Sequence, residues 1–226
     1  ELIWQRHNDG WQLRSQGLQL HSENQPWRNW QLQLDKRAEQ YAGQMDPLQL
    51  SELTPLAGML LPVDSAASEA LRTLAPQGQL NKLRFSRDAE QDNWLFSGQL
   101  QQMQWQRWRM VPGLHAVDAT FRLSPKGVAL HLKQSAPQAW DLQPYFEKPW
   151  PVQDFSAELN WQMQKSGWVL TANHVQLKTD VVTTNTQFRL TQAAAQPLFL
   201  ALDSQVGLQD ASQAHYYFPH GAMGEP

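Results

Sequence analysis

Histidine, serine, glycine and acidic residues occur in this sequence without the spacing of a familiar catalytic or metal-binding motif. The seven histidines are scattered, with no HExxH or HxH spacing, so a metal site is not indicated. Ser97 and Ser166 each precede a glycine but lack the G-x-S-x-G spacing of a nucleophile elbow, and the glycines form no phosphate-binding loop. Asp203 and Asp210 could in principle act as paired carboxylates on a sugar, but solvated loop positions explain them better. The sequence therefore indicates no catalytic residue, no cofactor and no metal.

The charge and cysteine content exclude further classes of protein. The chain has 18 basic and 21 acidic residues, so it lacks the basic surplus of a nucleic-acid-binding protein. The absence of cysteine excludes disulfide frameworks, thiolate metal sites and cysteine nucleophiles. Hydrophobic residues make up 41% of the 226 residues, whereas charged residues make up only 17% and many glutamines take their place. We therefore expect a folded domain with a polar but nearly uncharged surface.

The apolar stretches are short. The longest nearly apolar stretch, Leu56 to Val63, is far below the roughly 20 residues that a membrane-spanning helix needs. The sequence begins at Glu1 without a start methionine or a signal peptide, and it ends at Pro226. We interpret residues 1–226 as a single segment of a longer protein.

Apolar and polar residues alternate along most of the chain, which is typical of strands with one buried face. Clear runs extend from Trp94 to Leu100, from Val117 to Leu123 and from Phe155 to Met163. Turn residues separate such runs at residues 8–10, 124–127 and 165–167, where hairpin loops are expected. The pattern predicts a mainly β fold built as an antiparallel meander.

One stretch has helical spacing instead. Leucines recur every three or four residues from Leu50 to Leu60, with Ser51 able to cap the helix and Pro62 able to stop it. A second helix could begin at Asp64 and end before the proline and glycine that follow Ala75. We expect a short helical hairpin at residues 48–76, inserted between strands and lying against the sheet or over its open end.

The apolar side of such a sheet must be covered. A second sheet, closure of the sheet on itself, bilayer lipid around a barrel, and individual lipid molecules in a groove are all compatible with the alternation. The eleven tryptophans favour a wide cleft over a sandwich, because the sheets of a sandwich lie only about 10 Å apart.

Three short phrases give the sequence a family resemblance. Residues 104–119, with Val111-Pro112-Gly113-Leu114 inside them, resemble the "w...PGl.gl.G" phrase of the AsmA-like proteins of Gram-negative bacteria. Residues 75–80 resemble the "P.G.l..l" phrase of that family. Residues 210–224 resemble the "d...a..YlP...m" phrase in the central domain of its YhdP branch. The order of the phrases and the helical stretch follow that domain across nearly the whole chain.

The resemblance implies a repeating β-groove, a U-shaped, taco-like antiparallel sheet that is apolar inside. It implies one section of a hydrophobic conduit that spans the periplasm and carries phospholipid between the inner and outer membranes. The partners would be phospholipid acyl chains and the two membranes, reached through parts of the protein outside this chain. An N-terminal anchor in the inner membrane, absent from this sequence, is also implied. No enzyme activity is expected.

The residues that would line the groove are the large apolar side chains that share one face of the predicted strands. Any one of them could equally pack as ordinary core, so their continuity carries the hypothesis. They are Trp94, Phe96, Leu100, Phe121, Leu123, Leu130, Leu132, Phe155, Leu159, Trp161, Trp168, Leu170, Phe188 and Leu190.

A carbohydrate-binding β-sandwich module is the alternative function. Such modules stack exposed tryptophans on sugar rings, and these tryptophans should lie on the polar face or at loop tips. Trp27, Trp108, Trp140 and Trp150 fall outside clean alternation and are the candidates for that role. Most other tryptophans are in register with leucine and phenylalanine, which favours the groove.

Overall fold

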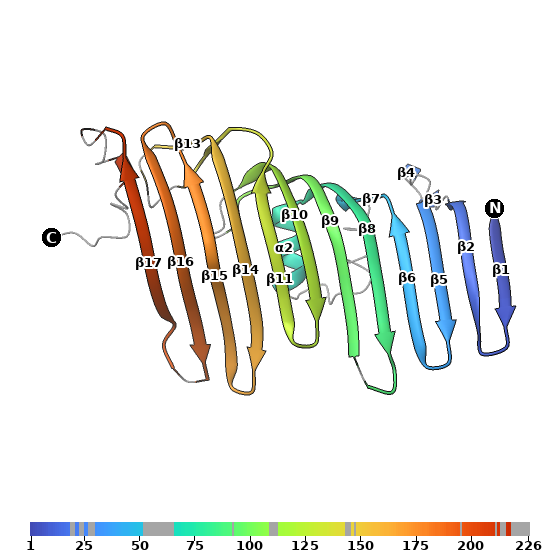
Figure 1. Cartoon of the computed structure of the whole chain (residues 1–226). Coiled ribbons are helices and arrows are strands. Elements are labelled where there is room, and N and C mark those ends of the chain that lie inside the picture. Colours follow the sequence, from blue (N-terminus) through green and yellow to red (C-terminus); the bar gives the residue numbers. More distant parts are fainter. Residues whose placement is uncertain are drawn as a thin grey trace.

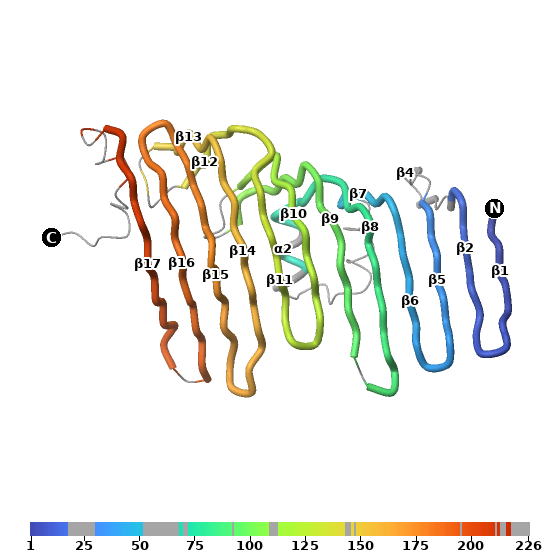
Figure 2. The backbone as a smooth tube through the Cα atoms, in the orientation of Figure 1, coloured from blue at the N-terminus to red at the C-terminus, as the bar shows by residue number. Residues whose placement is uncertain are grey.

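The fold is a single open antiparallel sheet, seen in a computed structural model of the chain (Figure 1). Twelve of its thirteen strands form a path in which neighbours in space follow one another along the chain, as the tube in Figure 2 shows, and β1 and β17 are the two edges. The mainly β fold predicted from the alternation is confirmed. The structure describes residues 1–18, 21–22, 25–26, 30–51, 66–91, 93–108, 113–142, 146, 148–194, 196–210, 212 and 216–217.

The twelve strands of the path have the following bounds: β1 (Leu2–His7), β2 (Gly10–Leu18), β5 (Trp30–Arg37), β6 (Gln40–Asp46), β8 (Gln77–Asp88), β9 (Asn93–Trp105), β10 (Leu114–Ser124), β11 (Gly127–Gln134), β14 (Asp154–Gln164), β15 (Gly167–Lys178), β16 (Val182–Ala193) and β17 (Phe199–Leu208). The short strand β7 (Leu48–Gln49) pairs with β8. Two small hairpins lie outside the large sheet, β3 (His21–Ser22) with β4 (Gln25–Pro26), and β12 (Gln138–Trp140) with β13 (Trp150–Val152).

The predicted helical hairpin is present in part. Helix α2 (Ala66–Leu74) matches the second predicted helix, and its last carbonyl, on Leu74, accepts a hydrogen bond of 2.8 Å from the backbone amide of Gln106. Leu50 and Ser51 are helical, as the first predicted helix requires. The rest of that helix, residues 52–65, lies outside the described residues.

Tight turns join consecutive strands at one end of the strands. We call this side of the sheet the turn edge; it runs across the strand ends, whereas β1 and β17 are the edge strands. The three predicted hairpin loops are all found there, with turns at residues 8–9, 125–126 and 165–166. Gly167 follows the last of these turns with a φ of 146°. A side chain there would overlap the backbone carbonyl oxygen of Gln192 on the neighbouring strand, so the turn depends on glycine.

Extra residues interrupt the strand register away from the turn edge. In β9, Gln102 has a φ of 48°, and its amide donates a hydrogen bond of 2.8 Å to Oδ1 of Asp118 on β10. In β8, Lys82 has a φ of 51°, and its amide donates in the same way to Oδ1 of Asp46, at 2.9 Å. Such β-bulges bend a strand and increase its twist. Each aspartate therefore accepts a hydrogen bond from the backbone amide that its bulge removes from the strand pairing.

Two buried clusters lie on the apolar side of the sheet, at the ends of the strands away from the turn edge. The larger cluster joins Val117 and Phe155 of the sheet to Trp140 and Val152 of the small β12–β13 hairpin. The smaller cluster is formed by Trp30, Leu48 and Leu80, which come from β5, β7 and β8. The core of the protein is therefore concentrated along the strand ends that these short elements cover.

The turn glycine gives a direct test of the fold. We expect Gly167→Ala to lower the free energy of unfolding by about 2–4 kcal/mol, because the added methyl group meets backbone and the φ disfavours alanine. Gly207→Ala in β17 is the matched control, because its added atom comes no closer than 3.8 Å to Thr183 and should change stability by less than about 0.5 kcal/mol. Urea unfolding measures both. Equal stability of the two variants would contradict the described register.

Candidate functional site

An unbroken row of side chains crosses one face of the whole sheet. Each position in the row is paired in register with the next, so all members project to the same side. Eleven of the twelve positions are large and apolar, and the twelfth is glycine. In strand order from β1 to β17 the row consists of Trp4, Leu13, Leu34, Gly43, Phe85, Phe96, Leu123, Val128, Trp161, Leu170, Leu190 and Leu200.

A second apolar row runs beside the first over the C-terminal half of the sheet. It is also paired strand by strand, from β10 to β17. Successive residues on one face of a strand are about 7 Å apart, so the two rows are close enough for one hydrocarbon chain to contact both. The second row consists of Phe121, Leu130, Leu159, Ala172, Phe188 and Leu202.

All fourteen residues predicted to line a groove lie on this apolar face. Five belong to the first row and four to the second, and the other five are in register with the same face: Trp94, Leu100, Leu132, Phe155 and Trp168. Aromatic contacts agree with this placement, because the ring of Phe96 lies 4.8 Å from that of Phe85 and 5.7 Å from that of Trp94. Their contact with lipid stays a prediction.

Burial on the apolar face falls from the covered strand ends toward the turn edge. Phe155 is only 9% exposed, because it belongs to the larger buried cluster and its ring lies 4.7 Å from that of Trp140. Met163, eight residues further along the same strand, is 58% exposed. Phe155 is thus core, whereas the apolar face near the turn edge is open to a ligand.

The apolar residues at both ends of the sheet were not among the predicted groove residues. Trp4 and Leu13 continue the first row in β1 and β2, and Leu200 and Leu202 continue the rows in β17. Trp4 and Leu200 are 59% and 56% exposed. Alternation was visible in these runs as well, and register with their neighbours is the additional signal that assigns them to the same face.

The opposite face is polar along the same strands. The row next to the first apolar row contains Arg14, Arg84, Arg122 and Arg189, with glutamine, asparagine, serine and threonine at most other positions. The sheet is therefore two-faced, as the sequence predicted.

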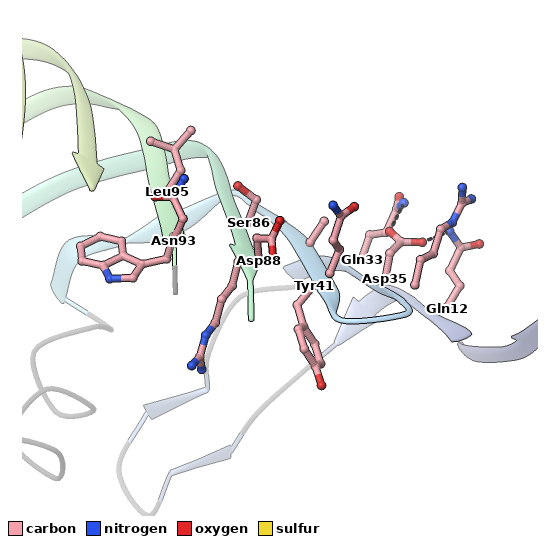
Figure 3. Close-up of a pocket in the computed structure, with 13 residues that line it drawn as sticks. Gln12, Gln33, Asp35, Tyr41, Ser86, Asp88, Asn93 and Leu95 are labelled. Carbon is pink, nitrogen blue, oxygen red and sulfur yellow. Dashed lines mark hydrogen bonds between the residues drawn. The ribbon is translucent and has the colours of Figure 1, made fainter. Parts of the chain in front are cut away.

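A hollow of about 630 Å³ lies at the turn edge over β2, β5, β6, β8 and β9 (Figure 3). Side chains point to both sides of the sheet at this place. Figure 3 shows Gln33, Ser86 and Leu95 on one side and Tyr41 on the other. Asp35 accepts hydrogen bonds from the side-chain amides of Gln12 and Gln33, the latter at 2.8 Å. These three residues thus form a hydrogen-bonded group on the polar side of the hollow.

Ionisable residues do not form a reactive cluster in the described part of the chain. No group of three or more metal-ligating side chains occurs among the described residues. Asp203 lies within strand β17 rather than in the expected loop, and it accepts a hydrogen bond of 3.4 Å from Gln187 on β16. Asp210 follows that strand and accepts a hydrogen bond of 2.9 Å from the amide of Ser212. Both carboxylates thus take part in local structure. Within the described ranges, no helix combines the length and hydropathy needed to span a membrane.

Comparisons with known proteins give a consistent result. A model of the YhdP protein family matches residues 1–226. The intermembrane phospholipid transporter YhdP of Escherichia coli (strain K12) is 26% identical over 238 residues, which cover 97% of this chain and 18% of the relative. The chain therefore spans less than a fifth of the length of that relative. No solved structure matches the chain significantly.

The gradient of burial can be tested with two truncations on one strand. We expect Phe155→Ala to lower the free energy of unfolding by about 3–5 kcal/mol, because it leaves a cavity in the larger cluster. Met163→Ala should cost less than about 1 kcal/mol, because more than half of that side chain already contacts solvent. Denaturant titration of both variants measures the difference. Similar losses would mean that the turn edge is packed as tightly as the core.

Proposed function

Because the chain belongs to the YhdP protein family, we propose that its apolar face conducts phospholipid between two membranes as one section of a longer conduit. The observation that supports this most directly is the first apolar row. It crosses twelve strands in register, and at Trp4, Phe96 and Leu200 it is exposed. An exposed apolar band of this extent marks a surface that binds another apolar molecule.

Transfer energies explain why such a surface would help a lipid to cross water. Moving an acyl chain through water costs roughly 0.8 kcal/mol per CH₂ group, so a two-chain lipid faces a barrier on the order of 20 kcal/mol. On a continuous apolar row, a tail leaves one apolar side chain only as it contacts the next. The Escherichia coli relative is named an intermembrane phospholipid transporter, which supports lipid as the cargo.

The dimensions of the sheet suit one section of a conduit. Neighbouring strands lie about 4.8 Å apart, so twelve strands extend the row over roughly 50 Å. The edge strands β1 and β17 could pair with further strands and continue the row in both directions. We place this section in the periplasm, within a protein anchored in the inner membrane by a segment outside this chain, as the family resemblance implies. In this proposal the segment carries out no chemical step.

The positions of the tryptophans disfavour the carbohydrate-binding alternative. Trp140 and Trp150, two of its four candidates, belong to or pack against the larger buried cluster. Trp161 and Trp168 lie on the apolar face. Trp27 lies outside the described residues. A sugar-binding platform would instead need tryptophans on the polar face or at loop tips.

Site-specific photocrosslinking in the intact protein tests the proposed function. A photoreactive residue at Phe96 or at Met163 should capture phospholipid in cells, because both side chains lie on the open part of the apolar face. The matched positions are Ser97 and Gln162, each one residue away on the polar face. Mass spectrometry of the adducts identifies the lipid. Equal capture at both pairs of positions would contradict the assignment of the faces.

A charge on the apolar face should slow transport without unfolding the protein. We expect Leu190→Asp to reduce phospholipid transfer by about tenfold, because a tail must desolvate the carboxylate to pass it. The free energy of unfolding should change by less than about 1 kcal/mol, because the paired Leu200 is exposed and water can reach the site. Arg189→Asp, on the polar face, is the control and should leave transfer unchanged. Transfer at the normal rate by Leu190→Asp would exclude this path for the lipid.

A further inference from the structure

A third row of paired residues lies on the apolar face, at the turn edge of strands β1, β2, β5, β6, β8 and β9. Cationic and aromatic side chains alternate along it. We infer that this row, the headgroup rim, binds the phosphate of a phospholipid whose acyl chains lie on the adjacent apolar row. The inference rests on the proposed function and adds a site for the polar part of the lipid. In register from β1 to β9 the headgroup rim consists of Arg6, Trp11, Lys36, Tyr41, Arg87 and Trp94.

The headgroup rim borders the first apolar row directly. Arg6 is two residues from Trp4 on β1, and Trp94 is two residues from Phe96 on β9, so the two rows are about 7 Å apart on the same face. Tyr41 projects to the side of the sheet opposite Gln33 and Ser86, as expected for this face (Figure 3). A molecule on the apolar row therefore has the rim within reach of its polar end.

The side chains of the rim reach solvent, and Lys36 contacts Tyr41. Arg6 and Arg87 are exposed, and Trp11, Lys36 and Tyr41 are half-buried. Nζ of Lys36 lies 5.4 Å from the centre of the Tyr41 ring, within the range of a cation–π interaction. The aromatic rings can thus hold the long cationic side chains at the border between the apolar row and water.

The charge of the row favours an anion. It has three cationic positions and no acidic one, and a cation recurs on every second strand, at a spacing of about 10 Å. Asp9, Glu39, Asp88 and Glu90 lie at or beside the turns, and Asp35, next to Lys36 on β5, lies on the opposite face. Asp88 Oδ1 accepts hydrogen bonds from the amides of Glu90 and Gln91. Hydrogen bonds from Arg and Lys to phosphate are charge-assisted and stronger than neutral ones.

The corresponding strand positions of β14 to β16 lack this chemistry, and the cations of that half at the turn edge, Lys126 and Lys165, lie in the turns themselves. Met163, Trp168 and Gln192 are paired in register on β14, β15 and β16, in the same position relative to the turn edge, and none is charged. Alternating cations and amphipathic aromatics are the residues that proteins place at a membrane interface, where lipid phosphates meet apolar tails. Alternating cations and aromatic rings within the strands are therefore a feature of the N-terminal half of the sheet.

Two lipids that differ only in the phosphoglycerol headgroup test the inference. The intact protein is titrated with dioctanoyl phosphatidylglycerol and, separately, with dioctanoyl glycerol, and binding is measured by calorimetry. The triple variant Arg6→Gln, Lys36→Gln, Arg87→Gln should bind the phosphatidylglycerol about fivefold more weakly, with binding of dioctanoyl glycerol unchanged. The matched control, Arg14→Gln, Arg84→Gln, Arg189→Gln, removes three exposed arginines from the polar face and should leave both affinities unchanged.

Each outcome decides the inference. Equal affinity of the unmodified protein for the two lipids overturns it, as does an equal loss in both triple variants, which would reflect net charge alone. A lower melting temperature with the preference retained would show that the rim only stabilises the sheet. In all these cases the proposed function stands, because dioctanoyl glycerol still binds; if neither lipid binds, the proposed function fails as well. If the triple variant does not fold, Arg6→Gln alone, on the exposed edge strand, should weaken phosphatidylglycerol binding about twofold.

Discussion

The two-residue period of the antiparallel register is the constraint on which the rest of this structure depends. Because side chains alternate between the two faces, a shift of one residue in the pairing of a strand would move all of its apolar side chains to the polar face. Twelve strands keep the register well enough for one apolar row to cross all of them, from Trp4 to Leu200. The bulges at Lys82 and Gln102 add residues to their strands, yet Phe85 and Phe96 still oppose each other on the apolar face. The continuity of the face is thus a property of pairing rather than of any single residue.

Stability and accessibility are divided between the two ends of the strands. At the covered ends, Trp140 and Val152 of the small β12–β13 hairpin pack on Val117 and Phe155, which supplies the burial that a single sheet layer needs. Toward the turn edge the burial of the same strands decreases, and Met163 is largely exposed. The apolar surface near the turns can therefore bind a ligand without being needed as core. In the N-terminal half, the headgroup rim borders this open part of the apolar face.

Much of this arrangement could be predicted from local sequence, because alternation and turn chemistry act over a few residues. The strand from Phe155 to Met163, the turn before Gly167 and the common face of the fourteen apolar residues are examples. The family resemblance, which depends on the order of three short phrases, is confirmed by the family model. The covered end could not be predicted, because Trp140 and Trp150 lie outside the alternation and their burial depends on tertiary packing. The bulge at Gln102 was equally hidden, since glutamine carries no signal for a positive φ. The headgroup rim appears only when the register between successive hairpins is known.

The order of the strands in space follows their order along the chain, and this has a consequence for how such a protein can change in length. Each hairpin of the large sheet pairs with the hairpins before and after it, so the pairings among its described strands are local and no distant connection has to be rerouted when one is gained or lost. Duplicating one hairpin would lengthen the sheet by two strand spacings, or about 10 Å, and would return the chain to the same direction with the same faces. A family with this architecture could therefore match its reach to the distance it must cover by counting hairpins, while leaving the chemistry of each face intact.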